Sequence, residues 1–414
     1  MKILITGANG QLGCWLRLAA TGLAAPLTSA ENYFSCGCSK NQFPSSSNAP
    51  AHAADPGSHP GLPYSHPGLD PGSQYIFSDV AELSAESRIM LQKLGGEGVD
   101  FSTVFLDVTD LAAVREMVQN EGVDVIVNCA GFTNVDAAES QPDAAKLLNV
   151  QAAENLSVAM REVNGLLIHI STDYIFGGEP QNSPIPEDVP AAPLGVYART
   201  KWEGEEAVRR VGCRHVILRT AWLFSEFGKN FVRTMLRLTS ERPQIKVVDD
   251  QRGTPTYAAD LAETILTVLS AAAPLTAAEN YFSCSCSKNQ FPADGTTPSH
   301  AAASCCQSGL DSESQNYGLV FNYTDEGECT WYEFACTIYQ MANQMRESCY
   351  EIPGQARDDY KGSCEILPCR SEEFPSPVRR PAYSVLDKSQ IKAALGLEIP
   401  DWRESLRRCL ASLL

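Results

Sequence analysis

Three side chains in the middle of the sequence have the types and spacing needed for acid–base chemistry on a carbonyl group: Thr172, Tyr197 and Lys201. Tyr197 and Lys201 stand four residues apart in "YARTK", so a helix there would place them on one face. A neighbouring ammonium lowers the pKa of a phenol, which would let Tyr197 donate a proton to the carbonyl oxygen and recover it from solvent. Thr172 lies in the apolar stretch "GLLIHISTDYIF", where its hydroxyl could polarise the same carbonyl.

A glycine-rich turn at the start of the sequence could hold a hydride carrier for this chemistry. "KILITGANGQLG" combines a short buried strand, a turn containing Gly7, Gly10 and Gly13, and the beginning of a helix. Glycines permit a tight turn and let backbone N–H groups approach a pyrophosphate at the helix N-terminus. In this position the pattern indicates dinucleotide binding. Asp79, which ends the second predicted strand, could accept from the ribose hydroxyls, and its charge disfavours the extra phosphate of NADP without forbidding it.

Strand and helix patterns alternate around these residues. Apolar runs of strand length occur in "QYIFSDV", "VFLDVTD", "VDVIVNCAG", "GLLIHISTDYIF" and "CRHVILRTAWLF", and most are followed by helical spacing. This alternation predicts an α/β fold with a Rossmann-type doubly wound parallel sheet. We expect this sheet to form a dinucleotide-binding domain over residues 1–228. The looser pattern of residues 229–414 predicts a smaller, mainly substrate-binding domain over the C-terminal edge of the sheet.

Four stretches interrupt this pattern and are interpreted as loop insertions: about 25–74, 84–103, 274–315 and 345–364. The first contains "APLTSAENYFSCGCSKNQFP", and the third contains the near copy "APLTAAENYFSCSCSKNQFP". Long insertions at such junctions cost little closure entropy, so we expect these segments to be passengers, that is, loops that extend from the sheet edges and have no role in binding. The two Cys-x-Cys pairs could instead join into one four-thiolate zinc site. A duplicated insertion would carry its cysteines along without a function, which favours the passenger interpretation.

Composition narrows the class of protein. The 414 residues carry a formal net charge of −18, which argues against an extended nucleic-acid or anionic-membrane surface. No apolar run reaches the roughly 18 residues that a membrane span needs, and no export signal is recognised. Of the 15 cysteines, eight fall in the predicted insertions and the rest show no pairing pattern. We therefore expect a cytoplasmic protein with reduced thiols.

Longer motifs bear a resemblance to one family. These are "TGANGQLG", "VNCAGFTNVDAAE", "STDYIFGG", "VYARTKWEGE", "RTAWLF", "DDQRGTPTYAADLA" and "RRPAYSVLD". Together they resemble the dTDP-4-dehydrorhamnose reductase family of the extended short-chain dehydrogenase/reductase superfamily, over the whole chain apart from the insertions. The resemblance implies an oxidoreductase of dTDP-rhamnose biosynthesis that uses NADPH or NADH. It would reduce the C4 ketone of the nucleotide sugar dTDP-6-deoxy-L-lyxo-4-hexulose to dTDP-L-rhamnose.

The resemblance also implies roles for individual residues. Tyr197 would be the proton donor, Lys201 would hold the nicotinamide ribose and tune Tyr197, and Thr172 would bind the sugar oxygen. The remaining implied contacts are Gly10, Gln11 and Leu12 with the pyrophosphate, Asp79 and Val80 with the ribose, Asp107 and Val108 with the adenine, Gly131, Phe132 and Thr133 with the nicotinamide side, and Asp173 and Trp222 with the sugar. Arg379 and Arg380 are candidates for the substrate diphosphate because planar guanidinium groups suit it; a solvated pair is the alternative.

The chain departs from the family in one respect, and two other functions stay open. Some members carry a magnesium-binding glutamate in the first helix at a dimer interface, whereas "GCWLRL" contains no acid. No metal site is therefore expected, and a homodimer is left open. One alternative function is a non-catalytic dinucleotide-binding regulatory subunit, like that of methionine adenosyltransferase. The other is a different nucleotide-sugar reductase or epimerase. The intact Thr172, Tyr197 and Lys201 favour the reductase.

Overall fold

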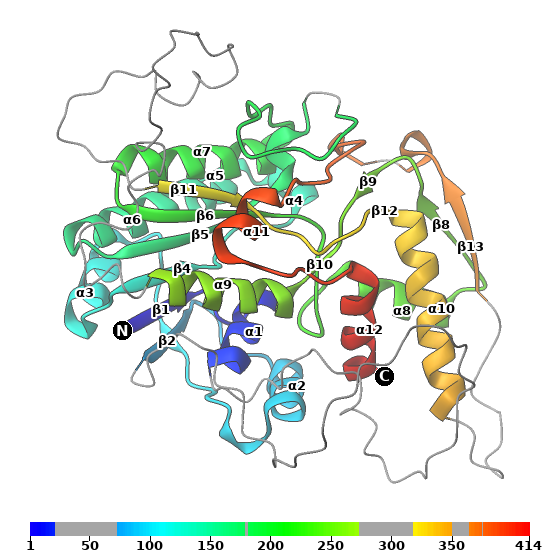
Figure 1. Ribbon diagram of the computed structural model, residues 1–414, viewed down its shortest axis with the longest axis horizontal. Coiled ribbons are helices and arrows are strands. Elements are labelled where there is room, and N and C mark those ends of the chain that lie inside the picture. The colour runs from blue at the N-terminus through cyan, green and yellow to red at the C-terminus, as the bar shows by residue number, and fades with distance from the viewer. Residues whose placement is uncertain (21–72, 179–180, 273–317, 350–363, 375) are drawn as a thin grey trace, which may run out of the picture.

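A seven-stranded parallel sheet forms the centre of the protein (Figure 1). The computed structural model describes residues 1–20, 73–178, 181–272, 318–349, 364–374 and 376–414. The strand order is β11-β6-β5-β4-β1-β2-β3. The strands are β1 (Lys2–Thr6), β2 (Gln74–Asp79), β3 (Val104–Phe105), β4 (Val125–Asn128), β5 (Leu166–Thr172), β6 (Arg214–Thr220) and β11 (Gly318–Asn322). The order reverses beside β1 and β4, where doubly wound folds bind their ligands, so the predicted fold class is confirmed.

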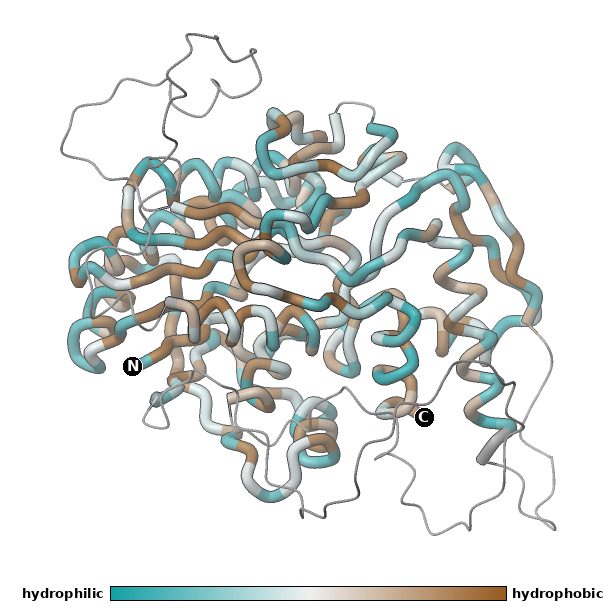
Figure 2. Tube along the Cα trace, viewed as in Figure 1, coloured by the Kyte–Doolittle hydropathy of each residue, from teal (hydrophilic) through white to brown (hydrophobic). Residues whose placement is uncertain are grey.

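Helices cover both faces of the sheet. Ile3 and Ile5 of β1 enter one apolar cluster and Leu4 enters the other, because successive strand residues point to opposite faces. One face packs against α1 (Gln11–Ala20) and α9 (Ala258–Ala272), and the other against α3 (Leu111–Glu121), α6 (Ala152–Glu162) and α7 (Gly195–Val211). Burial on both faces explains the hydrophobic runs of the central strands, which Figure 2 shows in brown.

A smaller group of elements stands beyond the carboxyl ends of the strands (Figure 1). Its strands pair as β8 with β13, β7 with β10, and β9 with β12. The bounds are β7 (Leu223–Phe224), α8 (Phe231–Glu241), β8 (Gln244–Val248), β9 (Arg252–Gly253), β10 (Thr256–Tyr257), β12 (Cys329–Thr330), α10 (Trp331–Cys349), β13 (Glu365–Cys369), η6 (Ser371–Glu373), α11 (Ser389–Leu395) and α12 (Trp402–Leu413). Three elements from beyond residue 228 return to the central sheet: α9 covers one face, β11 pairs with β6, and α11 packs against α9 and β11. The predicted boundary therefore divides the sequence but does not divide the fold.

The second predicted insertion, 84–103, differs from the looped-out passenger that the sequence suggested. It forms helix α2 (Ala85–Gly95) and the turn η1 (Gly96–Gly98), and α2 packs against α1. Leu83, Leu91 and Val99 are buried in the same core cluster as α1. These apolar residues are too widely spaced to reveal a packed helix from the sequence, and contacts with the distant helix α1 supply the stabilisation.

The other predicted insertions fall largely on residues that the structure does not describe. These are most of 25–74, all of 274–315 and most of 345–364, whose first five residues belong to α10. The two Cys-x-Cys pairs lie outside the described residues, so the zinc alternative stays a hypothesis. Within the described ranges, no helix has the length and apolarity needed to cross a membrane, and no group of His, Cys, Asp and Glu side chains is arranged to hold a metal ion.

Candidate active site

The glycine turn packs against the carboxyl end of strand β4. Gly7 has a φ of +65°, and a Cβ added to it would lie 2.6 Å from the Ala130 nitrogen. A Cβ on Gly13 would lie 2.5 Å from the Gly7 oxygen, so both positions require glycine. Gly10 is exposed, and its open side lies beside the first turn of α1, which contains Gln11 and Leu12. The first N–H groups of a helix lack intrahelical acceptors, so this end of α1 fits a pyrophosphate.

Arg17 hydrogen-bonds the glycine turn. This residue was not singled out from the sequence. Its side chain is fully buried. The guanidinium donates to the Ala8 carbonyl at 3.3 Å and to Asn9 Oδ1 at 3.0 Å. It also donates to the carbonyls of Asp100 and Ser102 at 3.2 and 2.7 Å. The only signal in the sequence is a charged residue inside the apolar helix "LGCWLRLAA". Arg17 therefore joins the glycine turn to the segment that was interpreted as an insertion.

The residues predicted to meet the adenosine half follow β2 and β3. Asp79 Oδ2 accepts from the Asn9 N–H at 3.1 Å, so this carboxylate faces the glycine turn. Val80 is 59% exposed beside it. Asp107 Oδ1 accepts from the Thr109 N–H at 2.9 Å, and Val108 is buried. All four residues lie at the carboxyl edge of the sheet, as a dinucleotide running across this edge requires.

The charge of Asp79 leads to a prediction about cofactor preference. Asp79→Asn should raise the ratio of kcat/KM for NADPH over NADH by about tenfold, because it removes ~1.4 kcal/mol of repulsion with the added phosphate in a partly exposed site. Steady-state kinetics with both cofactors measures the ratio. Asp107→Asn is the matched control, since this carboxylate follows the neighbouring strand β3 and its loss should affect both cofactors equally. An unchanged ratio in Asp79→Asn would contradict the placement of the ribose.

Asn149 holds the loop predicted for the nicotinamide side, Gly131 to Thr133, and sequence reasoning missed it. The residue is 1% exposed and lies in the π-helical turn η2 (Leu147–Gln151). Its Oδ1 accepts from the Phe132 N–H at 2.8 Å, and its Nδ2 donates to Thr200 Oγ1 at 3.0 Å. A buried amide inside the apolar helix "KLLNVQAAENL" was the available signal. Asn149 thereby connects this loop to helix α7, next to Lys201.

Tyr197 lies near the start of α7 and faces the end of β5. It packs with Phe132 in a small apolar cluster and makes an edge-on contact with Tyr174 at 5.5 Å between ring centroids. Burial raises the pKa of Tyr197 to about 12, against the lowering effect of a hydrogen bond with the Thr172 side chain. The pKa of Tyr197 is therefore raised, not lowered as the sequence suggested, because burial outweighs the hydrogen bond with Thr172 and the charge of Asp173 adds to the rise. The phenol keeps its proton at neutral pH, as a proton donor must.

Lys201 is buried one turn further along α7. Its Nζ donates to the Ile170 carbonyl of β5 at 2.7 Å. Burial lowers the pKa of Lys201 to about 8, and the negative charge of Glu205 opposes this lowering. Tyr197 and Lys201 therefore both face the last residues of β5, one through Thr172 and the other through Ile170. The i and i+4 spacing has placed them on one side of the helix as expected.

Asp173 lies directly after the predicted carbonyl-binding hydroxyl and is 2% exposed. Thr172 Oγ1 donates to Asp173 Oδ1 at 3.1 Å. Burial raises the pKa of Asp173 to about 6, and hydrogen bonds with Ser384 and Thr172 work against the rise. Ser384 comes from the C-terminal part of the chain, so the far end of the sequence contributes to the site. Its contribution could not be read from sequence spacing.

The remaining predicted substrate residues lie at the rim. Trp222 follows β6 with a φ of +47° and stacks on Trp331 of α10, with ring centroids 3.6 Å apart. Arg380 Nη2 donates to Asp136 Oδ2 at 3.3 Å. Burial raises the pKa of Tyr174 and the charge of Arg380 opposes the rise, which places Arg380 beside the tyrosine that contacts Tyr197.

Arg379, the other half of this predicted pair, is an exposed side chain. The structure thus brings one of the two arginines, Arg380, close to Tyr174. Its guanidinium is already engaged by a carboxylate, so a diphosphate would have to share it with Asp136.

Comparison with known proteins gives consistent matches. Residues 81–294 and 289–414 match the family model described as RmlD substrate binding domain. A dTDP-4-dehydrorhamnose reductase from Burkholderia thailandensis is 35% identical over 301 residues, which cover 73% of this chain and 86% of that protein. A crystal structure of a dTDP-4-dehydrorhamnose reductase from Clostridium acetobutylicum has a TM-score of 0.63 and 27% identity, and the match covers 99% of this chain and 98% of that one. A Bacillus anthracis dTDP-4-dehydrorhamnose reductase in complex with NADP has a TM-score of 0.60 and 25% identity, with the same coverage.

Proposed function

The chain belongs to the RmlD family of dTDP-4-dehydrorhamnose reductases, and on this basis we propose that it reduces the C4 ketone of dTDP-6-deoxy-L-lyxo-4-hexulose to dTDP-L-rhamnose, with NADPH or NADH. One observation carries the proposal. The protonated phenol of Tyr197 and the hydroxyl of Thr172 meet at the carboxyl end of β5, at the same edge of the sheet as a glycine turn that fits a pyrophosphate. This arrangement suits a ketone that receives a hydride and a proton.

The cofactor site is proposed along the carboxyl edge of the sheet. The turn from Gly7 to Gly13 would hold the pyrophosphate, Asp79 the ribose, and the loop after β4 the nicotinamide side. When bound there, NAD(P)H supplies the hydride that reaches C4 of the sugar. The region up to residue 228 provides these contacts, and we assign the nucleotide sugar mainly to residues from 229 onward.

Protein side chains would donate the proton that the ketone oxygen receives. Tyr197 and Thr172 hydrogen-bond the ketone oxygen, and Tyr197 transfers its phenolic proton to this oxygen as the C4 carbonyl becomes an alcohol. The ammonium of Lys201 stabilises the phenolate that is left, through charge, until solvent returns the proton. Asp173, Trp222 and Arg380 would contact the sugar nucleotide.

The test is oxidation of NADH and of NADPH by the purified protein, followed at 340 nm, with dTDP-6-deoxy-L-lyxo-4-hexulose generated in situ. We expect substrate-dependent oxidation and a product that co-elutes with dTDP-L-rhamnose. Dinucleotide binding without turnover would instead favour a regulatory subunit. Turnover that yields a different C4 epimer or an unreduced isomer would assign the chain to another nucleotide-sugar reductase or to an epimerase.

A further inference from the structure

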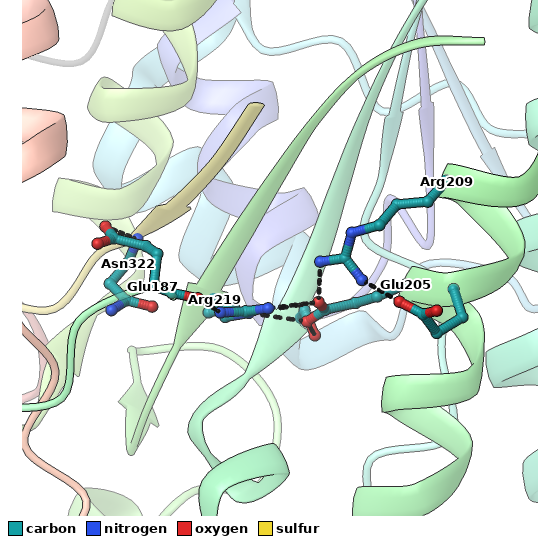
Figure 3. A network of polar contacts seen from close by, with 7 residues as sticks. Glu187, Glu205, Arg209, Arg219 and Asn322 are labelled. Carbon is teal, nitrogen blue, oxygen red and sulfur yellow. Dashed lines mark hydrogen bonds and ion pairs between the residues drawn. The ribbon is translucent and has the colours of Figure 1, made fainter. Parts of the chain in front are cut away.

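The fully buried carboxylate of Glu205 is the centre of a network of polar contacts (Figure 3). It lies on α7, one turn beyond Lys201. Its oxygens accept from Ser171 Oγ at 2.5 Å, from Arg219 Nη2 at 2.8 Å and from Arg209 Nη2 at 2.7 Å. Arg219 is 3% exposed and Arg209 is partly exposed, so the carboxylate binds one buried and one partly exposed guanidinium group.

The contacts of Arg219 extend this centre across the sheet. Arg219 Nη1 donates to the Glu187 carbonyl at 2.8 Å, and Glu187 Oε1 accepts from the Asn322 N–H of β11 at 2.9 Å (Figure 3). The Arg219 guanidinium also lies over the Phe176 ring, 5.1 Å from its centroid. The centre therefore connects α7, β5, β6, β11 and the turn η3 (Asp173–Phe176), which begins directly after Thr172.

The position of this centre indicates more than a stabilising contact. Ser171 precedes Thr172, and Glu205 stands at i+4 from Lys201, so the carboxylate links the two elements that carry the catalytic groups. A buried ion pair adds little net stability over apolar residues of similar volume, because desolvation offsets the attraction. Stability alone is therefore a weak reason for a carboxylate here. We propose, on the basis of the proposed reductase function, that Glu205 is a positioning residue that keeps Lys201 in its ammonium form and holds Thr172 against α7.

The charges around Lys201 support this assignment. Burial lowers the pKa of Lys201, and Glu205 is the largest influence that opposes the lowering. From β5, burial holds the pKa of His169 well below its ordinary value, so this side chain is neutral and adds no positive charge beside Lys201. At the end of β4, burial raises the pKa of Cys129 to about 12, which keeps this thiol neutral at pH 7.

The other neighbours of Glu205 are cationic or neutral. Arg209 and Arg219 carry positive charge, and burial lowers the pKa of His215 on β6. Removal of the Glu205 charge would leave the two guanidinium groups without their acceptor, and both would then disfavour the Lys201 ammonium. The effect on Lys201 should therefore appear as a shift in the pH dependence of activity.

The sign of the shift follows from these contacts. Activity requires the Lys201 ammonium, so kcat/KM should fall as the pH rises through the Lys201 pKa of about 8. In Glu205→Gln this alkaline limb should move to lower pH by about one unit, the size expected when a close opposite charge is lost. Glu205→Asp, which keeps the charge, should restore the limb toward the wild-type position. The pH dependence of NADPH affinity, measured by nicotinamide fluorescence, should shift in the same direction.

Asp260→Asn is the matched control. Asp260 is also a buried carboxylate, bound by Arg408 Nη2 at 2.6 Å and by Ser405 Oγ at 2.6 Å, and it lies between α9 and α12. Its loss should lower the thermal midpoint without moving the alkaline limb. Glu205→Gln with a lowered midpoint and an unmoved limb would show a purely structural role and overturn the proposal.

If Glu205→Gln does not fold, a second variant tests the same proposal. Arg209 is partly exposed on α7, and Arg209→Met removes a cation that competes for Glu205. It should move the alkaline limb to higher pH; an unmoved limb would also overturn the proposal. A wild-type protein that binds NADPH but lacks turnover would contradict the reductase function separately, and the fluorescence titration would still test Glu205.

Discussion

Tyr197→Phe should lower kcat for the nucleotide-sugar ketone by about 10²–10⁴-fold, the range for loss of a positioned proton donor. The phenol of Tyr197 keeps its proton because burial raises its pKa to about 12, and no other described hydroxyl combines this position with a hydrogen bond to Thr172. Removing one oxygen leaves the ring, its packing and the glycine turn intact. Dissociation constants for NADPH, measured by fluorescence titration, should therefore stay close to the wild-type value while turnover is lost.

Tyr174→Phe is the control for this variant. Tyr174 is mostly buried and makes an edge-on contact with Tyr197, and it loses the same single oxygen. It lies in η3, and only its backbone N–H, not its phenol, hydrogen-bonds the Thr172 hydroxyl among the contacts described. Its kcat should fall far less. Equal losses in the two variants would show that Tyr197 is not the specific proton donor.

Arg17→Met should lower the free energy of unfolding by ~1–3 kcal/mol, the cost of leaving the buried Ala8 carbonyl without its donor. The carbonyls of Ala8, Asp100 and Ser102 all lose their donor in this variant. Methionine keeps much of the apolar volume over Phe77, so the loss reports mainly on hydrogen bonds. Urea unfolding followed by circular dichroism measures the change. NADPH affinity should fall as well, because the glycine turn loses its anchor.

Two further variants make this prediction specific. Arg237→Met removes an exposed arginine from helix α8 and should leave the unfolding midpoint at the wild-type value. Arg17→Lys keeps the charge but offers no planar set of donors to so many acceptors, so its stability should resemble that of Arg17→Met. An Arg17→Met protein as stable as the wild type would mean that the glycine turn does not depend on the segment around residues 100–103.

Local patterns in the sequence were sufficient for the fold class and for the main chemistry. Alternating strand and helix periods predicted the parallel sheet, and the glycine spacing predicted the turn between β1 and α1. The i and i+4 spacing predicted that Tyr197 and Lys201 share a face of one helix. Each of these features depends on residues within a few positions of one another, where backbone geometry alone relates spacing to direction.

Contacts between distant segments decided what the sequence left open. Helix α2 is packed rather than looped out because it meets α1, and β11 joins the sheet because it pairs with β6. Asn149 and Arg17 acquire their roles through partners far away in the chain, and Glu205 through partners on three different elements.

Burial, too, is a tertiary property. The sequence spacing suggested that Lys201 lowers the pKa of Tyr197. In the structure, burial raises the pKa of Tyr197 to about 12 and lowers that of Lys201 to about 8. The sequence by itself determined which groups could react, since composition and spacing are local. Only the tertiary structure decided their protonation, because the cost of burying a charge depends on everything packed around it.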